Sequence, residues 1–189
     1  MQYILQDLER RYGQRKSLKG FFEFAGQLPE SLEYVEVTYE TKPPEYIREK
    51  RDTFETHRSD FYRQFAEAHG EDLLAMGISN TAIDRMLQFG YRPKSRLGEV
   101  LDISIDHILS LQFGGNNSFR NICLLSGKIN HFKNILEQLQ INTQEGSNKI
   151  ITIMPKYING RRAAVPIIQG GFKPRIKNAG LIKPNTPHQ

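Results

Sequence analysis

The chain has 189 residues, of which 38% are hydrophobic, and a formal net charge of +5, which suits one domain with extensions or two small ones. No apolar run approaches the roughly 18–20 residues that a membrane span needs, and the N-terminal segment lacks the pattern of a signal peptide. The single cysteine, Cys123, lies in an apolar run and is expected to be a buried thiol.

Charge is distributed unevenly along the sequence. Residues 1–95 contain 14 Lys or Arg against 16 Asp or Glu, whereas residues 96–189 contain 12 against 5. Residues 146–189 contain eight basic side chains and no acidic one. Such an imbalance indicates a polyanionic partner, and nucleic acid is the common choice because neutralised phosphates release counterions. A solvated basic tail that serves solubility is the alternative that charge alone leaves open.

The first half of the sequence is mainly helical in pattern. Helical spacing of apolar residues predicts a helix near the N-terminus that breaks near Gly20. Alternation then predicts a strand from Leu32 to Glu40. A long charged helix follows, for which Gly70 is the expected end, and a short helix is capped by Ser79 or Asn80 and stops at Gly90.

The second half begins with strand-like sequence. Apolar and polar residues alternate from Val100 to Asp106 and predict a strand, and residues 107–113 run on into the turn that follows. Residues 114–117, Gly-Gly-Asn-Asn, tolerate positive φ and predict a sharp turn. A second strand-like run leads to Ser126, a typical cap for the helix that follows. One apolar stripe marks that helix, formed by Ile129, Phe132, Leu136 and Leu139.

Several groups around this turn suit a metal-assisted reaction. Two strands and one helix of this size bury little surface, so a bound ion is a candidate for bracing them. Asp106 offers a hard oxygen ligand for Mg²⁺ or Mn²⁺, and the helix offers a second ligand at Asn130 or His131. His107 follows Asp106 directly, so we expect it to point elsewhere and to take a proton from water.

Residues 105–133 resemble the motif of the HNH endonucleases, the ββα-metal nuclease family. That motif has an acid-His or His-His pair, a Gly-Gly-x-Asn turn, a middle Asn followed by an aliphatic residue, and a closing Asn or His on a helix. The matching residues here are Asp106-His107, Gly114 to Asn117, Asn121-Ile122, and Asn130 or His131. The resemblance covers residues 100–140. A weaker likeness, over residues 73–94, is to the segment that precedes HNH domains in bacterial polymorphic toxins.

The resemblance implies a role for each matched residue. His107 is expected to be the general base that deprotonates the attacking water, and Asp106 a metal ligand. Asn121 is expected to hold the loop that carries the base through hydrogen bonds from its side chain to the backbone. Asn130 is the closing metal ligand by spacing, with His131 as the alternative and Asn134, one turn further, as an additional contact.

Basic residues near the motif are expected to contact phosphates. Lys133, or an arginine such as Arg120, would contact a phosphate next to the cleaved bond. The pair Arg161-Arg162 is either another phosphate contact or a solvated turn. One divalent cation is implied, with Mg²⁺ or Mn²⁺ favoured and Ni²⁺ or Zn²⁺ as alternatives.

We therefore predict an α+β protein with a mainly helical N-terminal region and a C-terminal ββα-metal (HNH) nuclease unit. Residues 1–75 form the N-terminal region, whose role the sequence does not indicate. Residues 76–155 form the nuclease domain. Residues 156–189 form a basic tail rich in Gly and Pro, and a strand is predicted over residues 149–158.

The predicted function is metal-dependent cleavage of DNA, and the sequence does not separate DNA from RNA as substrate. A catalytically inactive nucleic-acid-binding module on the same scaffold is the alternative from another class. Two contexts fit an active enzyme. It is an antibacterial toxin, delivered into a target cell and blocked by an acidic immunity protein, or a cytoplasmic restriction or phage-encoded nuclease. No membrane partner is expected, and the oligomeric state is not indicated.

Overall fold

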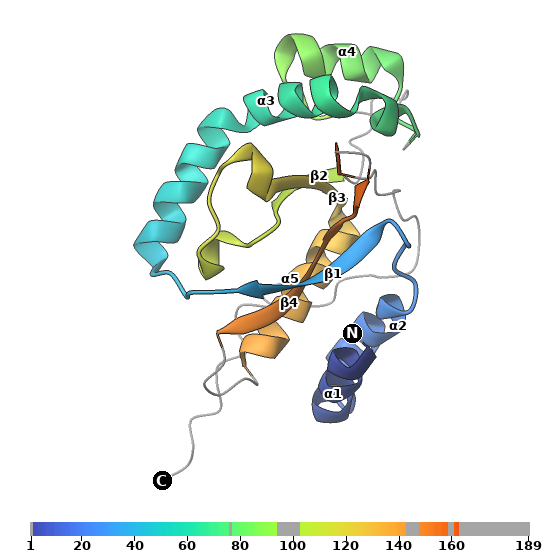
Figure 1. Cartoon of the computed structure of the whole chain (residues 1–189), viewed down its shortest axis with the longest axis vertical. Coiled ribbons are helices and arrows are strands. Elements are labelled where there is room, and N and C mark those ends of the chain that lie inside the picture. The colour runs from blue at the N-terminus through green and yellow to red at the C-terminus, as the bar shows by residue number, and fades with distance from the viewer. Residues whose placement is uncertain (1, 76, 94–102, 143–147, 159–160, 163–189) are drawn as a thin grey trace.

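The computed structural model describes residues 2–75, 77–93, 103–142, 148–158 and 161–162, and Figure 1 shows their arrangement. Helices and strands are mixed along the chain, which confirms the predicted α+β class. In chain order the elements are α1 (Gln2–Tyr12), η1 (Lys16–Leu18), α2 (Lys19–Ala25), β1 (Leu32–Thr38), α3 (Pro44–Ala75), α4 (Asn80–Phe89), β2 (Ile103–His107), η2 (Leu111–Phe113), η3 (Phe119–Asn121), β3 (Ile122–Ser126), α5 (Gly127–Ile141), β4 (Lys149–Pro155), β5 (Tyr157–Ile158) and β6 (Arg161–Arg162). Within these ranges, no helix combines the length and apolar character that crossing a bilayer requires.

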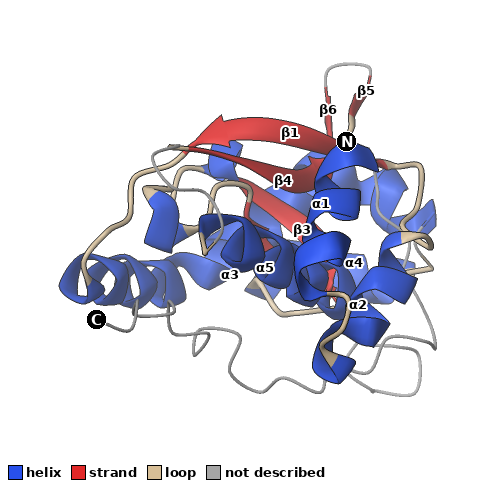
Figure 2. Ribbon diagram, turned by 90° about the horizontal axis from the view of Figure 1, so that it is seen from below, coloured by secondary structure: helices blue, strands red, loops and turns tan. Residues whose placement is uncertain are grey.

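The strands form antiparallel pairs, β1 with β4, β2 with β3, and the short β5 with β6. In the first pair, Leu32 lies opposite Pro155 and Thr38 opposite Lys149. An exposed ion pair of 2.7 Å between Glu36 and Lys149 joins positions 113 residues apart. Figures 1 and 2 both show β1 and β4 side by side. A strand from the N-terminal region is thus paired with the strand that follows α5.

Two hydrophobic clusters connect the two halves of the chain. The first joins α1 and α2 to α5, where the rings of Phe21 and Phe132 stack with centroids 4.6 Å apart. The second joins α3 and α4 to β2 and β3 and includes Phe54, Ile103 and Leu124. Because each cluster takes residues from both sides of position 75, residues 1–75 do not pack as a separate unit.

Helix α5 lies at the centre of the packing and forms as the sequence predicted. The Ser126 side chain caps it by accepting a hydrogen bond from the backbone N–H of Ile129. All four residues of the predicted apolar stripe are buried. Its last turns are bonded to β4, because the Gln140 amide donates to the carbonyl oxygen of Ile151 and accepts from the backbone N–H of the same residue, at 2.6 and 2.8 Å.

The boundaries of the N-terminal helices differ from the prediction in two places. The first break comes at Gly13, and Gly20 lies inside α2 rather than ending a helix. The long helix was expected to end at Gly70, and its backbone is interrupted one residue earlier, at His69, whose φ is −136°; a further helical stretch then continues α3 to Ala75. The tertiary contacts of Leu73, which is 1% exposed, outweigh the low helix propensity of the glycine.

Other predicted elements are confirmed. Strand β1 follows the predicted alternation, and Cys123 is buried and forms no disulfide. Helix α4 is capped by Ser79 and ends at Gly90, whose φ is 64°. A Cβ at Gly90 would lie 2.3 Å from the carbonyl oxygen of Ser59, so glycine also permits the close contact of α4 with α3. Of the predicted basic tail, the backbone of residues 156–158 and 161–162 is described, and the rest lies outside the described residues.

Candidate active site

Two glycines shape the chain between β2 and β3. Gly114 has a φ of 94°, in the region that favours glycine. A Cβ at Gly115 would lie 1.8 Å from the carbonyl oxygen of Leu109, so only glycine lets these two segments approach. The predicted turn is therefore confirmed. Strand β2 ends at His107, one residue beyond the predicted end at Asp106, and the backbone of Leu109 after it is bonded to a side chain.

That side chain belongs to Asn121, which uses its whole amide on the loop. Its Oδ1 accepts from the backbone N–H of Leu109 at 2.9 Å, and its Nδ2 donates to the carbonyl oxygens of Leu109 at 3.1 Å and Asn116 at 2.9 Å. These are hydrogen bonds of the kind that the sequence resemblance implied for Asn121. They join the start of the loop to its end and so fix the backbone that follows His107.

His107 is the last residue of β2 and is only 9% exposed. Its Nε2 lies 2.8 Å from Oδ1 of Asn117, and its ring lies against Phe54 of α3, with centroids 4.9 Å apart. Burial lowers the pKa of His107 below its usual value of 6.5, although the hydrogen bond with Asn117 and the charge of Asp106 oppose this shift. The imidazole is therefore neutral at pH 7, as a general base has to be.

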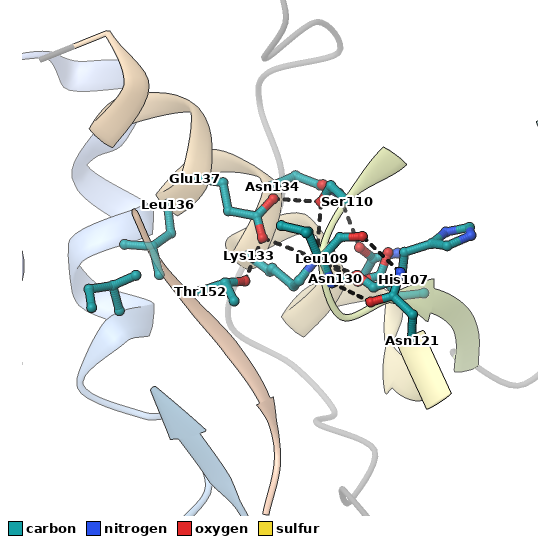
Figure 3. Close-up of polar contacts among 12 residues, drawn as sticks. His107, Leu109, Ser110, Asn121, Asn130, Lys133, Asn134, Leu136, Glu137 and Thr152 are labelled. Carbon is teal, nitrogen blue, oxygen red and sulfur yellow. Dashed lines mark hydrogen bonds and ion pairs between the residues drawn. The ribbon is translucent and has the colours of Figure 1, made fainter. Parts of the chain in front are cut away.

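A buried cluster of polar groups lies beside His107, and Figure 3 shows its members from α5 and from the loop. The Lys133 ammonium lies 2.9 Å from Oδ2 of Asp106 and 3.2 Å from Oε1 of Glu137. It also donates to the carbonyl oxygen of His107 at 2.8 Å and to Oγ of Ser110 at 3.2 Å. Lys133 and Glu137 are both 0% exposed, so this is an interior ion-pair network.

Glu137 completes the cluster on its other side. Its carboxylate accepts hydrogen bonds from Oγ of Ser110 at 2.6 Å and from Oγ1 of Thr152 on β4. Burial by itself would lower the pKa of Lys133, but the carboxylates of Asp106 and Glu137 outweigh burial and hold that pKa well above its usual value. The ammonium is therefore charged at any ordinary pH, and it holds β2, α5 and the loop together.

An open cleft of about 610 Å³ lies next to this cluster. Helix α3 contributes to its lining from one side, and β2, the loop after it and α5 contribute from the other. The lining residues are Arg51, Phe54, Glu55, Asp106, His107, Ser110, Leu111, Gln112, Asn134 and Gln138. Asp106 is 14% exposed, and its Oδ2 is buried against Lys133. Its Oδ1 makes no hydrogen bond to the residues that the structure describes and is the oxygen left for a ligand.

Helix α5 places its three candidate metal ligands differently. Asn134 lines the cleft together with Asp106 and His107, and its Nδ2 donates to Oδ1 of Asn130 at 3.0 Å. Asn130 and His131 are half-buried and do not line the cleft. Burial lowers the pKa of His131. Of these three candidates, Asn134 is therefore the one that lines the cleft with Asp106, and Asn130 is linked to it by that hydrogen bond.

The oxygen atoms of Asp106, Asn130 and Asn134 suit a hard cation such as Mg²⁺ or Mn²⁺. Zn²⁺ prefers nitrogen and sulfur ligands and fits this set less well. No group of three or more His, Cys, Asp or Glu side chains in the described part of the chain is placed to hold a metal. One carboxylate that already faces an ammonium, with two neutral amides, makes a weak site that substrate oxygens would have to complete.

The residues expected to contact phosphate are not gathered at the cleft. The expected phosphate contact of Lys133 is wrong, because its ammonium is buried between two carboxylates and cannot reach a phosphate without breaking that network. Arg120 is exposed on η3 but does not line the cleft. Arg161 and Arg162 form β6, and their side chains lie outside the described residues.

Sequence reasoning missed the basic residue that does line the cleft, Arg51 of α3. It is exposed and makes no ion pair or hydrogen bond to the described residues. Nothing in the charged pattern of α3 distinguishes it, because side chains of both signs surround it in the sequence. The pairing of Lys133 with Glu137 did leave a signal, since two opposite charges four residues apart lie beside the apolar stripe of α5.

Comparison of the chain with models of protein families, with curated proteins and with solved structures found no match. The resemblance to HNH nucleases therefore rests on the motif residues themselves and on the way in which they come together.

Proposed function

We propose that this protein is a metal-dependent HNH endonuclease that hydrolyses phosphodiester bonds in DNA, with β2, β3 and α5 as its ββα-metal unit. One observation carries the proposal: the buried His107 lines the same cleft as Asp106 and Asn134. The order of strand, Gly-Gly turn, strand and helix supports the same assignment, as do the hydrogen bonds of Asn121 across the turn.

In the proposed reaction, a water oxygen attacks the phosphorus atom and the bond from phosphorus to the 3′ oxygen breaks. His107 takes the proton of that water, and solvent protonates the leaving oxygen. Arg51 binds the phosphate oxygens through its guanidinium group, whose planar donors match them. Asp106, Asn130 and Asn134 would hold a divalent cation, which supplies positive charge for the phosphoryl and leaving oxygens when bound.

Asn121 and Lys133 act through other residues in this proposal. Asn121 fixes the loop after the base, and Lys133 fixes both the carboxylate of Asp106 and the carbonyl group of His107. Such supporting contacts set the orientation of a reacting group and commonly change activity by about 10–100-fold. We therefore expect both residues to affect the rate of cleavage without contacting DNA.

A plasmid-nicking assay tests the proposal. The full chain is incubated with supercoiled DNA and Mg²⁺, Mn²⁺, Ni²⁺ or Zn²⁺, and a matched reaction contains EDTA. We expect nicking with Mg²⁺ or Mn²⁺, its loss with EDTA, and its loss in His107→Ala. His57→Ala, at an exposed position of α3, is the control variant and should nick like the parent. A folded protein that binds the plasmid and never nicks it would refute the enzyme proposal.

A second candidate function is nucleic-acid binding without cleavage, on the same scaffold. The ion pair of 2.9 Å between Asp106 and Lys133 favours it, because an ammonium beside the only carboxylate of the donor set competes with a cation. This candidate predicts equal DNA affinity with Mg²⁺ and with EDTA. The nuclease proposal predicts tighter binding with a non-hydrolysed DNA analogue when Mg²⁺ is present.

The biological context stays a prediction. A toxin that is blocked by an acidic immunity protein would make bacterial expression lethal, and the lethality would depend on His107. A restriction or phage-encoded nuclease would be tolerated by a host with protected DNA.

A further inference from the structure

Asn117 connects the proposed base to the long helix α3. The Oδ1 atom of Asn117 lies 2.8 Å from Nε2 of His107, and its Nδ2 donates to the backbone carbonyl oxygen of Lys50 at 2.8 Å. The side chain of its neighbour Asn116 makes a local hydrogen bond of the kind common in turns: its Oδ1 accepts from the backbone N–H of Ser118 at 2.9 Å. The sequence predicted turn chemistry for both residues, so the contacts of Asn117 are a finding of the tertiary structure.

The direction of these two hydrogen bonds follows from what each group can do. The carbonyl oxygen of Lys50 can only accept, so the amide nitrogen of Asn117 has to face it. The amide oxygen then faces His107, and an amide oxygen can only accept. Nε2 of His107 therefore carries the hydrogen, and in a neutral imidazole the lone pair is on Nδ1. Nδ1 makes no hydrogen bond to the residues that the structure describes.

Helix α3 holds the same region at two further points. The Tyr46 hydroxyl donates to the carbonyl oxygen of Gly115 at 3.3 Å, and Phe54 lies against the His107 ring. Tyr46, Lys50 and Phe54 are spaced by four residues, so they lie along one face of the helix. This face contacts the Gly-Gly turn, the amide of Asn117 and the imidazole in succession.

We propose that Asn117 is a positioning residue that fixes His107 in the tautomer with hydrogen on Nε2, leaving Nδ1 as the atom that accepts the proton from water. The catalytic part of this inference rests on the nuclease function proposed above. It assigns a role to α3, whose carbonyl group at Lys50 selects the orientation of the amide. Without that anchor, the amide can rotate and present either its oxygen or its nitrogen to the ring.

Nitrogen-15 NMR of the imidazole rings tests the tautomer without any assay of activity. Spectra of the full chain are recorded at about pH 8, where histidine is neutral, and the signals of His107 are assigned by their absence in His107→Gln. We expect the parent protein to have a protonated Nε2 and an unprotonated Nδ1. A parent spectrum with hydrogen mainly on Nδ1 would overturn the inference, whatever the protein does to DNA.

Variants at two adjacent positions separate positioning from simple loss of structure. Asn117→Leu removes both hydrogen bonds at similar size, and we expect a mixture of tautomers and cleavage slower by about 10–100-fold. Asn117→Asp keeps an acceptor for Nε2 and should keep the parent tautomer. Asn116→Leu is the matched control and should change neither the tautomer nor the rate. A parent-like tautomer and parent-like rate in Asn117→Leu would refute the role.

The two proposals fail in different ways. If the parent has the expected tautomer and Asn117→Leu loses it, but no variant nicks DNA, the nuclease function fails and only the fixing of the ring is upheld. If DNA is nicked but Asn117→Leu keeps both rate and tautomer, the positioning role fails and the nuclease function stands. Should Asn117→Leu not fold, as judged by circular dichroism, the parent spectrum and Asn117→Asp still decide the tautomer.

Discussion

The Lys133 ammonium lies 2.9 Å from Oδ2 of Asp106, and neither atom reaches solvent. A helix and a strand are thus joined by charge inside the protein, directly beside the cleft that His107 lines. The same lysine also contacts Glu137, Ser110 and the carbonyl group of His107, so it fixes the backbone of the proposed base from inside the protein.

Lys133→Met should destabilise the fold severely. The change keeps most of the side-chain volume but leaves Asp106 and Glu137 buried without a counter-charge, which typically costs about 3–5 kcal/mol. Urea denaturation followed by circular dichroism measures the effect. Lys16→Met, at an exposed position on η1, is the control and should change the free energy of unfolding by about 0.5 kcal/mol or less. Equal stability of the two variants would contradict the interior network.

Gly115→Ala should disrupt the turn. The added Cβ would lie 1.8 Å from the carbonyl oxygen of Leu109, so the backbone has to move and the hydrogen bonds of Asn121 are strained. We expect a loss of more than about 1 kcal/mol in the free energy of unfolding. Gly70→Ala is the matched control, because a Cβ there meets nothing within 4 Å and alanine favours the helix by about 0.5–1 kcal/mol. A neutral Gly115→Ala would mean that the two segments are not in contact.

Stability and activity should both decrease in mild acid. Burial lowers the pKa of His107 and of His131, so the unfolded chain binds protons near the usual value of 6.5 while the folded chain does not. The contribution of these two histidines to the free energy of unfolding is therefore present in full above pH 6.5, and it is lost as the pH drops through the lowered pKa values. Urea denaturation at pH 7.5 and 5.5 measures this difference.

His107→Gln should make that decrease smaller, because the side chain that gains a proton on unfolding is then absent. For cleavage, the sign is the same: His107 accepts a proton only when neutral, so the rate should be constant near pH 7 and decline below about 6.5. A rate that rises steadily from pH 7 to 9 would point to a different base.

Arg51→Ala should weaken DNA binding in a manner that depends on salt. Without one phosphate contact, DNA binding releases about one counterion fewer. The slope of log affinity against log salt concentration should therefore become less steep by about 1. Fluorescence anisotropy with a labelled duplex at several salt concentrations measures the slope. Arg48→Ala, on the same helix but outside the cleft lining, removes an equal charge and should change the slope less. Equal slopes in the two variants would show that Arg51 has no special contact.

Local signals predicted the elements that the site needs. The alternation before Asp106, the glycines at 114 and 115, and the cap at Ser126 each act within a few residues, so their pattern is readable in sequence. The hydrogen bonds of Asn121 were also anticipated, through the resemblance of the motif. Element ends were less predictable: Gly20 and Gly70 are poor helix formers, yet both lie inside helices because buried neighbours hold them there.

The sequence by itself determined the order of strand, turn, strand and helix, and the candidate base and acid at positions 107 and 106. Only the tertiary structure decided which side chains surround them. Burial turned Lys133 from an expected phosphate contact into an interior ion pair. The docking of α3 brought Phe54 to the imidazole, Arg51 to the cleft that His107 lines, and the carbonyl group of Lys50 to the amide of Asn117. The physical reason is distance along the chain: contacts between residues 50 and 117 depend on how whole elements pack, and no local pattern encodes that.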